Sequence, residues 1–306
     1  MRLAAKCIAA RRRVLYDKKQ SFRGSRNDKE GFMMYPAFYQ IPAEELGKDS
    51  KVPILILADS GEVHFELALE MLDEIVKNNA AGRRTVFICP YGPIGQYHTF
   101  ARLVNERRVS LKNVWIINMD EYLTDEGEWL PYEDPRSFRA GMDRELYSKI
   151  DPELVMPAEQ RVFPDPHNPG AIQQLIDTLG GVDIVMGGIA VNGHIAFNEP
   201  EPEMTNEQFA QLPTRVEKLS QATLLKDAIM VRGGAIDTVP KQAVTVGMKE
   251  MLGARKLRLT MMADMQRAVI RRAGYGEVTA SFPVSFAQTH PDAKIIISRN
   301  VAEKPF

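Results

Sequence analysis

The sequence predicts an α/β fold of three layers, α/β/α, in which helices cover both faces of a mainly parallel, Rossmann-like doubly wound sheet. Short apolar runs alternate with helix-like segments from about residue 52 to the end of the chain. A short, continuous apolar run is typical of a strand that is covered on both faces. Strands that alternate with helices favour crossover connections, and crossovers produce a parallel sheet.

The first predicted strand is the apolar run 52–58, after which Asp59 or Ser60 can cap a helix over 63–77. Further strands are predicted over 85–89, 113–118, 183–186, 242–246, 257–262 and 294–298, and further helices over 97–106, 137–150, 171–179 and 265–273. Polar or glycine-rich loops at 59–62, 92–96, 119–122 and 187–199 follow four of these strands. Because ligands of parallel sheets bind beyond the carboxyl ends of the strands, these loops are expected to surround one crevice.

Composition excludes several classes of partner. The formal net charge of -1 gives no electrostatic reason to expect nucleic acid or an anionic membrane as a partner. No apolar run approaches the ~20 residues that span a bilayer. The chain contains two cysteines, Cys7 and Cys89, and this low number favours a reducing, cytoplasmic compartment over a disulfide framework.

The N-terminal part differs from the rest and predicts two parts: a basic extension over 1–51 and one domain over 52–306. Residues 1–26 carry nine lysines and arginines and a single acid, Asp17. Such a start occurs in organelle transit peptides, but a helix over 4–15 that packs its apolar side on the domain is the favoured interpretation. A second irregular stretch, Pro200–Pro213, reads as a mobile excursion that could act as a lid, or as an ordinary surface loop.

The motif Gly187–Pro200 carries the most chemistry. It follows the predicted strand 183–186, and glycines such as Gly188 and Gly193 let the backbone turn sharply and approach a ligand. His194 and Glu199 form a plausible acid/base device, since imidazole titrates near neutral pH. Taken alone, such a short motif is more often a tight turn whose polar side chains satisfy backbone groups.

Asp120 and Glu121 form a second candidate at the end of the predicted strand 113–118. Paired acids at this position can hold a metal, cap a helix or supply a general base. A metal site would need further ligands, and no His-x-His or His-x3-His spacing occurs in the chain.

Four motifs in the same order resemble the glucosamine-6-phosphate deaminase/isomerase family. They are Asn118-Met119-Asp120-Glu121-Tyr122, Gly193-His194-Ile195-Ala196-Phe197-Asn198-Glu199-Pro200, Val239-Pro240-Lys241-Gln242-Ala243-Val244-Thr245-Val246-Gly247 and Pro283-Val284-Ser285-Phe286-Ala287-Gln288-Thr289-His290-Pro291. The resemblance covers about residues 53–300. The related 6-phosphogluconolactonases share the Gly-His turn but generally lack the Asn-Met-Asp-Glu-Tyr and Phe-Asn-Glu-Pro forms.

The resemblance implies conversion of a phosphorylated 2-amino sugar to a ketose phosphate and ammonia, without a metal or organic cofactor. Asp120 then matches the base that moves a proton from C2 toward C1, His194 the group that shuttles a proton during ring opening, and Glu199 its carboxylate partner. The partner is a small sugar or sugar phosphate, and similar proteins commonly assemble into closed homo-oligomers. The residues that the resemblance places around the substrate are Gly92, Ile94, Gly95, Gln96, Glu121, Gly188 and Arg267.

Three departures from the family pattern bear on activity. Asn192 stands where the family has an aspartate that orients the imidazole, and an amide can select the wrong tautomer. The family's Thr-Gly-Gly-Thr/Ser-Pro phosphate loop aligns with Gly92–Gln96, where Pro93 removes an amide donor and no hydroxyl remains. Arg267 replaces a lysine and keeps the cation. The family's arginine after the lid region has no clear counterpart, although Arg232 is near in sequence.

The leading hypothesis is therefore a sugar-phosphate isomerase/deaminase whose substrate differs from glucosamine 6-phosphate. Two alternatives remain open. One is hydrolysis of a sugar lactone by water that His194 activates, for which Asp120 would be dispensable. The other is a catalytically degenerate protein that binds a sugar for regulation, marked by Asn192 and the altered loop.

Overall fold

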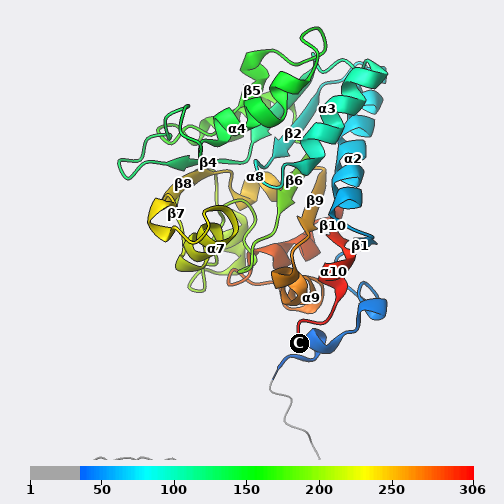
Figure 1. Cartoon of the computed structure of the whole chain (residues 1–306), viewed down its shortest axis with the longest axis vertical. Helices are drawn as coiled ribbons and strands as arrows, with labels where there is room; N and C mark the ends of the chain where they lie inside the picture. Colours follow the sequence, from blue (N-terminus) through cyan, green and yellow to red (C-terminus); the bar gives the residue numbers. More distant parts are fainter. Residues whose placement is uncertain (1–34) are drawn as a thin grey trace, which may run out of the picture. The chain divides into compact units, whose positions relative to one another are not determined.

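A sheet of parallel strands runs through the part of the chain that the computed structural model describes, residues 35–306 (Figure 1). Within that part it has seven strands, which pair in the order β1 (Ile54–Leu57), β10 (Ala293–Ser298), β9 (Lys256–Met261), β6 (Ile184–Gly188), β2 (Thr85–Cys89), β3 (Val114–Asn118) and β5 (Arg161–Val162). All six pairings are parallel, so their carboxyl ends lie at one edge. The predicted three-layer α/β/α class is confirmed.

Helices cover both faces of this sheet. The longest, α2 (Ser60–Ala80), begins after Asp59, whose side chain accepts a hydrogen bond from the Glu62 amide, and it packs beside α3 (Gly95–Arg107). The face covered by α2 also carries α4 (Phe138–Glu145). The opposite face carries α5 (Ala171–Leu179), α8 (Met248–Leu252), α9 (Arg267–Tyr275), the 3-10 segment η8 (Pro283–Thr289) and the last described helix, α10 (Arg299–Ala302). The predicted helix over 171–179 matches α5 at both ends.

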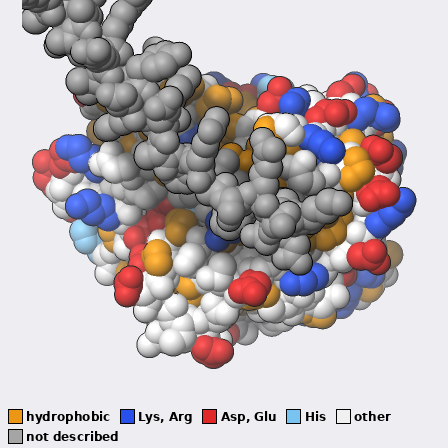
Figure 2. Space-filling model, turned by 90° about the horizontal axis from the view of Figure 1, so that it is seen from below, with side chains coloured by type: hydrophobic (Ala, Val, Ile, Leu, Met, Phe, Trp, Pro, Cys, Tyr) orange, Lys and Arg blue, Asp and Glu red, His pale blue; other side chains and the backbone are white. Residues whose placement is uncertain are grey.

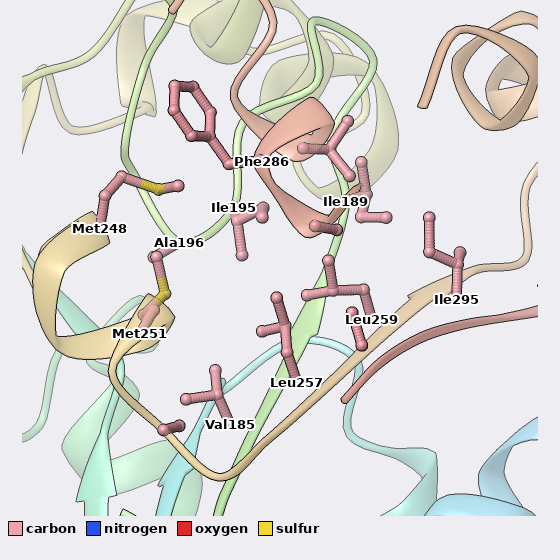
Figure 3. Packing of buried hydrophobic residues seen from close by; sticks show 14 of the residues in the cluster. Val185, Ile189, Ile195, Ala196, Met248, Met251, Leu257, Leu259, Phe286 and Ile295 are labelled. Atoms are coloured by element: carbon pink, nitrogen blue, oxygen red, sulfur yellow. The ribbon is translucent and has the colours of Figure 1, made fainter. Parts of the chain in front are cut away.

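The alternation of side chains along each strand separates two apolar cores. In β2, Phe87 and Cys89 face the core under α2 and α3, whereas Val86 and Ile88 face the core under α5 and α9. In the second core, Met248 and Met251 of α8 and Phe286 of η8 pack over Val185 and Leu257 of the sheet (Figure 3). Because side chains alternate between the two faces of a strand, an apolar run such as 85–89 can supply both cores.

A small antiparallel sheet stands beside the large one and was not predicted. Within the described residues it consists of β4 (Asp120–Leu123), β8 (Gln242–Thr245) and β7 (Arg215–Lys218) in the order β4-β8-β7. The prediction that residues 242–246 continue the parallel sheet is therefore wrong. Apolar content alone cannot assign a strand to a sheet, and here the Val246 amide donates to the Met119 carbonyl, which joins β8 to the segment leaving β3.

Two further predictions need correction. Residues 200–213 are not a free excursion over the crevice, because they contain the helix α6 (Asn206–Ala210) and bury Phe209 against Phe286. The predicted helix over 137–150 ends at Glu145 and continues as a separate 3-10 turn, Tyr147–Lys149. One helix that the sequence did not indicate, α7 (Gln221–Val231), follows β7 and is important for the site.

The described part of the predicted extension is tied to the domain. Leu46 is buried in the apolar core, and the Arg271 guanidinium donates to the Ile41 carbonyl. Residues 37–306 form one compact unit, and a boundary at 51/52 stays a prediction. The predicted helix over 4–15 lies outside the described residues. Within the described part, no helix has the length and apolarity that a membrane crossing requires. On the face seen in Figure 2, basic and acidic side chains are interspersed.

Candidate active site

A pocket of about 640 Å³ opens beyond the carboxyl ends of the central strands. The loops that the sequence predicted to meet there each contribute to its wall. The contributing residues are Ser60 after β1, Gly92 after β2, Asp120 after β3, Gly188 at the end of β6, and Ile189, Ala190 and His194 after β6. Residues of α7 close another side. The crevice therefore lies where an open parallel sheet binds ligands, as predicted.

Asp120 occupies the point where the chain leaves the central sheet and enters the small one. Asp120 lines the pocket, the residue is only 7% exposed, and its carboxylate accepts no hydrogen bond from any described residue. Burial raises the pKa of Asp120 to about 8, the negative charges of Glu121 and Asp227 add to the rise, and Lys226 opposes it. A buried carboxylate without partners is strongly basic when ionised, which suits the removal of a proton from carbon.

Glu121 is placed differently from the prediction. It is fully buried, does not line the pocket, and caps the N-terminus of α4 instead. Oε1 accepts from the Phe138 and Tyr122 amides, and Oε2 accepts from the Arg139 amide and the Ser137 hydroxyl, at 2.9–3.1 Å. Because these four donors occupy the carboxylate, Glu121 positions α4 and has no free acceptor for a substrate.

His194 and Glu199 lie together, as predicted. His194 Nδ1 is 3.3 Å from Glu199 Oε2 and 3.2 Å from Thr223 Oγ1. Thr223 donates its hydroxyl proton to Glu199 Oε1, so both neighbours of Nδ1 are acceptors, and Nδ1 carries the ring proton. Nε2 has no hydrogen-bond partner among the described residues, and His194 lines the pocket. The arrangement leaves Nε2 as the nitrogen that can exchange a proton with a bound molecule.

Glu199 is held as an anion behind the imidazole. Burial alone would raise its pKa, but the hydrogen bond and charge of His194, with hydrogen bonds from Thr223 and the Ser220 amide, lower the pKa of Glu199 to about 2. The Ser220 hydroxyl donates to Glu199 Oε2 at 3.0 Å. A permanently ionised carboxylate next to Nδ1 fixes the tautomer and orientation of His194.

Asn192 completes this group rather than disrupting it. Its Nδ2 donates to Glu199 Oε2 at 2.7 Å, and its Oδ1 accepts from the His194 amide at 3.3 Å. The acceptor that the family pattern assigns to residue 192 is therefore supplied to the imidazole by Glu199. An aspartate at residue 192 would place a second negative charge beside Glu199. The amide of Asn192 instead donates a hydrogen bond to that carboxylate.

The tight turn that presents His194 depends on Gly193. Its φ is +83°, and a Cβ there would lie 2.5 Å from the Phe282 ring. Phe282 precedes η8, and the Val284 amide donates to the Gly193 carbonyl at 2.8 Å. Only glycine satisfies both the left-handed backbone and the close ring, so the sequence of this turn fixes the direction of the imidazole.

The loop after β2 is only partly in the pocket. Gly92 and Pro93 line it, whereas the predicted contacts Ile94, Gly95 and Gln96 do not. The His64 ring packs directly against Gly95, so closely that a Cβ on residue 95 would clash with it. The ring therefore lies between Gly95 and the pocket. Gln96 is buried and donates to the Pro93 carbonyl at 2.6 Å. Gly188, the remaining glycine of the predicted set, lies in the wall.

Arg267 is not where the resemblance places it. Its Nε donates to the Asn300 carbonyl at 2.9 Å, Nη2 lies 3.2 Å from Asp264 Oδ1, and the side chain does not line the pocket. Three other cations do line it: Arg136, which is paired with Asp134, and Lys226 and Arg232, on and just after α7. The Arg232 backbone bonds within and after α7, but its guanidinium has no hydrogen-bond or ion-pair partner among the described residues. A cation without an anionic partner in a pocket wall is a candidate contact for an anionic group.

Sequence reasoning missed the contribution of α7. Ser220 caps this helix by accepting from the Thr223 amide, and the next turns carry Thr223, Lys226 and Asp227 into the site. The signal that could have indicated α7 is Ser220 followed by an apolar run, which is typical of a helix start. No group of three or more His, Cys, Asp and Glu side chains in residues 35–306 is arranged to hold a metal ion.

The curated relatives of this chain include glucosamine-6-phosphate deaminases from several bacteria. The chain is 31% identical over 258 residues to the glucosamine-6-phosphate deaminase of Shewanella loihica, which covers 82% of this chain and 89% of that protein. It is 29% identical over 217 residues to glucosamine-6-phosphate deaminase 1 of Bacillus subtilis, with 69% and 82% covered. A scan against protein-family models finds no match.

Solved structures agree on the fold. A monomeric glucosamine-6-phosphate deaminase superposes with a TM-score of 0.70 at 26% identity, over 81% of this chain and 98% of that one. A 6-phosphogluconolactonase from Trypanosoma cruzi superposes with a TM-score of 0.58 at 16% identity, over 81% and 95%, which shows a shared fold only. On the extent and identity of the Shewanella match, this chain belongs to the glucosamine-6-phosphate deaminase family.

Proposed function

We propose that this protein opens the ring of a 2-amino-sugar phosphate, isomerises it and releases ammonia, leaving a ketose phosphate. The observation that carries the proposal is the placement of two proton-transfer groups on one pocket. Asp120 and His194 come from different strand ends and line the same cavity. The relatives that carry the name glucosamine-6-phosphate deaminase support the same reaction class.

Ring opening falls to His194. The free Nε2 accepts the hydroxyl proton at C1 and passes it to the ring oxygen, so that the bond between C1 and the ring oxygen breaks and the aldehyde forms. Glu199 stabilises the imidazolium form through Nδ1, in the way that a buried carboxylate supports a catalytic histidine. The retention of this pair despite Asn192 supports a catalytic role over a purely binding one.

The carbon chemistry falls to Asp120. Its carboxylate takes the C2 proton, and the C2–H electron pair forms a C1=C2 bond while the carbonyl π pair moves to O1. The nitrogen lone pair then forms C2=N, the C1=C2 pair takes the proton from Asp120 at C1, and a proton passes from nitrogen to O1. Water hydrolyses the imine to the ketone and ammonia. The high pKa of Asp120 suits both halves of this transfer.

The anionic end of the substrate requires a new contact. Because Arg267 is engaged with Asp264 and Asn300, and Pro93 has no amide proton, we propose that Arg232 binds the phosphate. The phosphate is then held by α7 instead of by the loop after β2. This change supports a substrate that differs in shape from glucosamine 6-phosphate.

Ammonia release tests the proposal. Purified protein is assayed with a panel of hexosamine 6-phosphates, free hexosamines and aldoses, with ammonia and ketose measured separately. We expect ammonia and ketose in equal amounts from at least one amino-sugar phosphate. If no member of the panel yields either product, the proposal fails.

A second candidate is hydrolysis of a sugar lactone, which the shared fold with 6-phosphogluconolactonases favours. Here His194 would activate water, and no carbon base would be needed. The Asp120→Asn variant separates the two reactions, because it should abolish isomerisation and leave lactone hydrolysis nearly unchanged.

Assembly and compartment stay predictions. We propose a closed homo-oligomer from the family resemblance, whereas the solved relative with 26% identity is described as monomeric. Sedimentation equilibrium of the full chain would decide between them. The cytoplasmic compartment rests on the low cysteine number alone.

A further inference from the structure

We infer that Lys226 is a further catalytic residue, whose ammonium group donates to the substrate oxygen that becomes negatively charged when Asp120 removes the C2 proton. The inference rests on the proposed function and adds to it the group that stabilises the enolate. Removal of a proton next to a carbonyl places a full charge on the oxygen. A buried base alone supplies nothing to hold that charge.

A short chain of hydrogen bonds fixes the position of Lys226. Its Nζ donates to Asp227 Oδ1 at 2.6 Å, and the Tyr122 hydroxyl donates to Asp227 Oδ2 at 2.6 Å. Asp227 and Tyr122 are only 5% and 6% exposed. Tyr122 belongs to β4, the strand that begins at Asp120. The lysine on α7 is thus tied to the strand that carries the base.

Lys226 also has donors to spare. An ammonium group has three N–H bonds, and one of them is used by Asp227. Arg136, another cation of the pocket wall, spends Nε and Nη2 on Asp134 and Nη1 on the Thr238 carbonyl. Lys226 is therefore a cation that is both anchored and able to donate into the pocket.

The charge of Lys226 acts on the right group. It is one of the charges that influence the pKa of Asp120, whereas Arg232 influences the pKa values of Tyr122 and Asp134. Lys226 and Asp120 also line the same pocket, so the ammonium group is available to the part of the substrate on which Asp120 acts. We therefore assign the oxygen at C1 to Lys226 and the phosphate to Arg232.

The electron flow gives Lys226 a defined task. As Asp120 accepts the C2 proton, the C1=C2 bond forms and the carbonyl pair moves to O1, where Lys226 donates a hydrogen bond and keeps its own proton. When the C1=C2 pair takes the proton back at C1, O1 receives a proton from the iminium nitrogen and Lys226 is unchanged. Asp227 touches no substrate in this scheme and is a positioning residue.

Substitution of Lys226 by methionine tests the role. We expect kcat to fall about 10²-fold or more, the cost of removing one oxyanion donor, while KM changes less than about 3-fold. Lys226→Arg should recover part of the loss, because it restores a cation at the same anchor. The matched control is Lys241→Met, since Lys241 also forms an ion pair with an aspartate, Asp125, but does not line the pocket.

A double variant guards against a structural explanation. Lys226→Met leaves the buried Asp227 carboxylate with Tyr122 as its one remaining partner, which can destabilise the fold. The double variant Lys226→Met/Asp227→Asn removes both charges, so no unpaired charge stays buried. We expect the double variant to unfold at a temperature near that of wild type and still to lose the same factor in kcat. A double variant that regains kcat would show that the charge of Asp227, and not the absence of Lys226, was at fault, and would overturn the inference.

The pH profile supplies a readout that packing does not move. The groups facing Asp120 are Glu121 of its own strand, Asp227 and Lys226 of α7, the Tyr122 hydroxyl and His194 across the pocket. Loss of the Lys226 charge should move the ascending limb of kcat/KM, where Asp120 ionises, to higher pH, and Asp227→Asn should move it to lower pH. Identical profiles for all three proteins would contradict the arrangement.

The outcomes separate the two proposals. If wild type releases ammonia and Lys226→Met raises KM without lowering kcat, Lys226 only binds substrate, and this inference fails while the proposed function stands. If wild type shows no activity with any member of the panel, both fail. A loss confined to kcat, with Lys241→Met unaffected, supports the inference.

Discussion

Asn192 Nδ2 lies 2.7 Å from Glu199 Oε2 and donates a hydrogen bond to it, so the residue that departs from the family pattern supports the carboxylate behind His194. In a serine-protease triad an Asp→Asn exchange costs roughly 10⁴ in kcat, because that aspartate is the acceptor for the imidazole. In this structure that acceptor is Glu199. The imidazole therefore has a carboxylate acceptor although residue 192 carries no charge.

Glu199→Gln should be the most damaging change behind the imidazole. It replaces the anion next to Nδ1 by a neutral amide, and we expect kcat to fall by about 10²-fold or more with ring-closed substrates. The loss should be smaller with a substrate that is already open-chain, because ring opening is then bypassed. Glu203→Gln, an exposed neighbour in sequence, is the control. Equal losses for both kinds of substrate would show that Glu199 does not act in ring opening.

Glu199 also predicts an acid-dependent loss of stability. Its pKa is about 2 in the fold and 4.5 without perturbation, so its contribution is present above about pH 4.5 and is lost as the pH falls toward 2. The linkage gives a contribution on the order of 3 kcal/mol. Urea unfolding between pH 2 and 6 should show wild type losing its advantage over Glu199→Gln in this window. A difference that is constant with pH would be evidence against an ionised Glu199.

Arg232 and Arg267 make a matched pair for the phosphate contact. Arg232→Met should raise KM for a sugar phosphate about 10-fold or more, because it removes a charge-assisted hydrogen bond, and should leave KM for an unphosphorylated sugar unchanged. Arg267→Met should change KM less than about 2-fold, since this side chain points to Asn300 and Asp264. The reverse order of effects, measured by initial rates, would restore the assignment from the family resemblance.

Gly193→Ala should misplace His194. The substitution combines a φ of +83° with a Cβ 2.5 Å from the Phe282 ring. Gly234→Ala is the control, because its φ is +96° and no atom lies within 4 Å of the new Cβ. Each change carries about 1 kcal/mol of backbone cost, and Gly193→Ala adds the clash. We expect a larger fall in the melting temperature and a loss of activity for Gly193→Ala alone; similar effects for the two would argue against the tight packing of this turn.

The sequence predicted the layers of the fold well because the signal there is local. A buried strand such as Thr85–Cys89 is a continuous apolar run, and its bounds in the structure are the predicted ones. The membership of Gln242–Thr245 in a second sheet could not be predicted, because an apolar run does not say which strand it will pair with. The pairing is decided by β4, a strand that begins with two acids and has little apolar signal of its own.

The site residues likewise fall into those that the sequence could predict and those that it could not. Asp120, His194 and Glu199 carry chemistry at strand ends, so topology alone brought them together. Glu121 and Arg267 were misplaced because motif identity does not show which way a side chain turns. Glu121 turns to the free amides of α4, and Arg267 turns to its own ion pair. The residues of α7 were missed because their contacts with Tyr122 and Glu199 join segments more than twenty positions apart.

The role of Asp120 is tested most directly by the pH dependence of ammonia release in wild type and in Asp120→Asn. A base must be ionised, so kcat/KM of wild type should rise with pH and level off above about 8, the value to which burial raises the pKa of Asp120. Asp120→Asn should lose about 10³-fold or more and lose this rise. Activity that survives the substitution with the same rise in pH would show that another group takes the C2 proton.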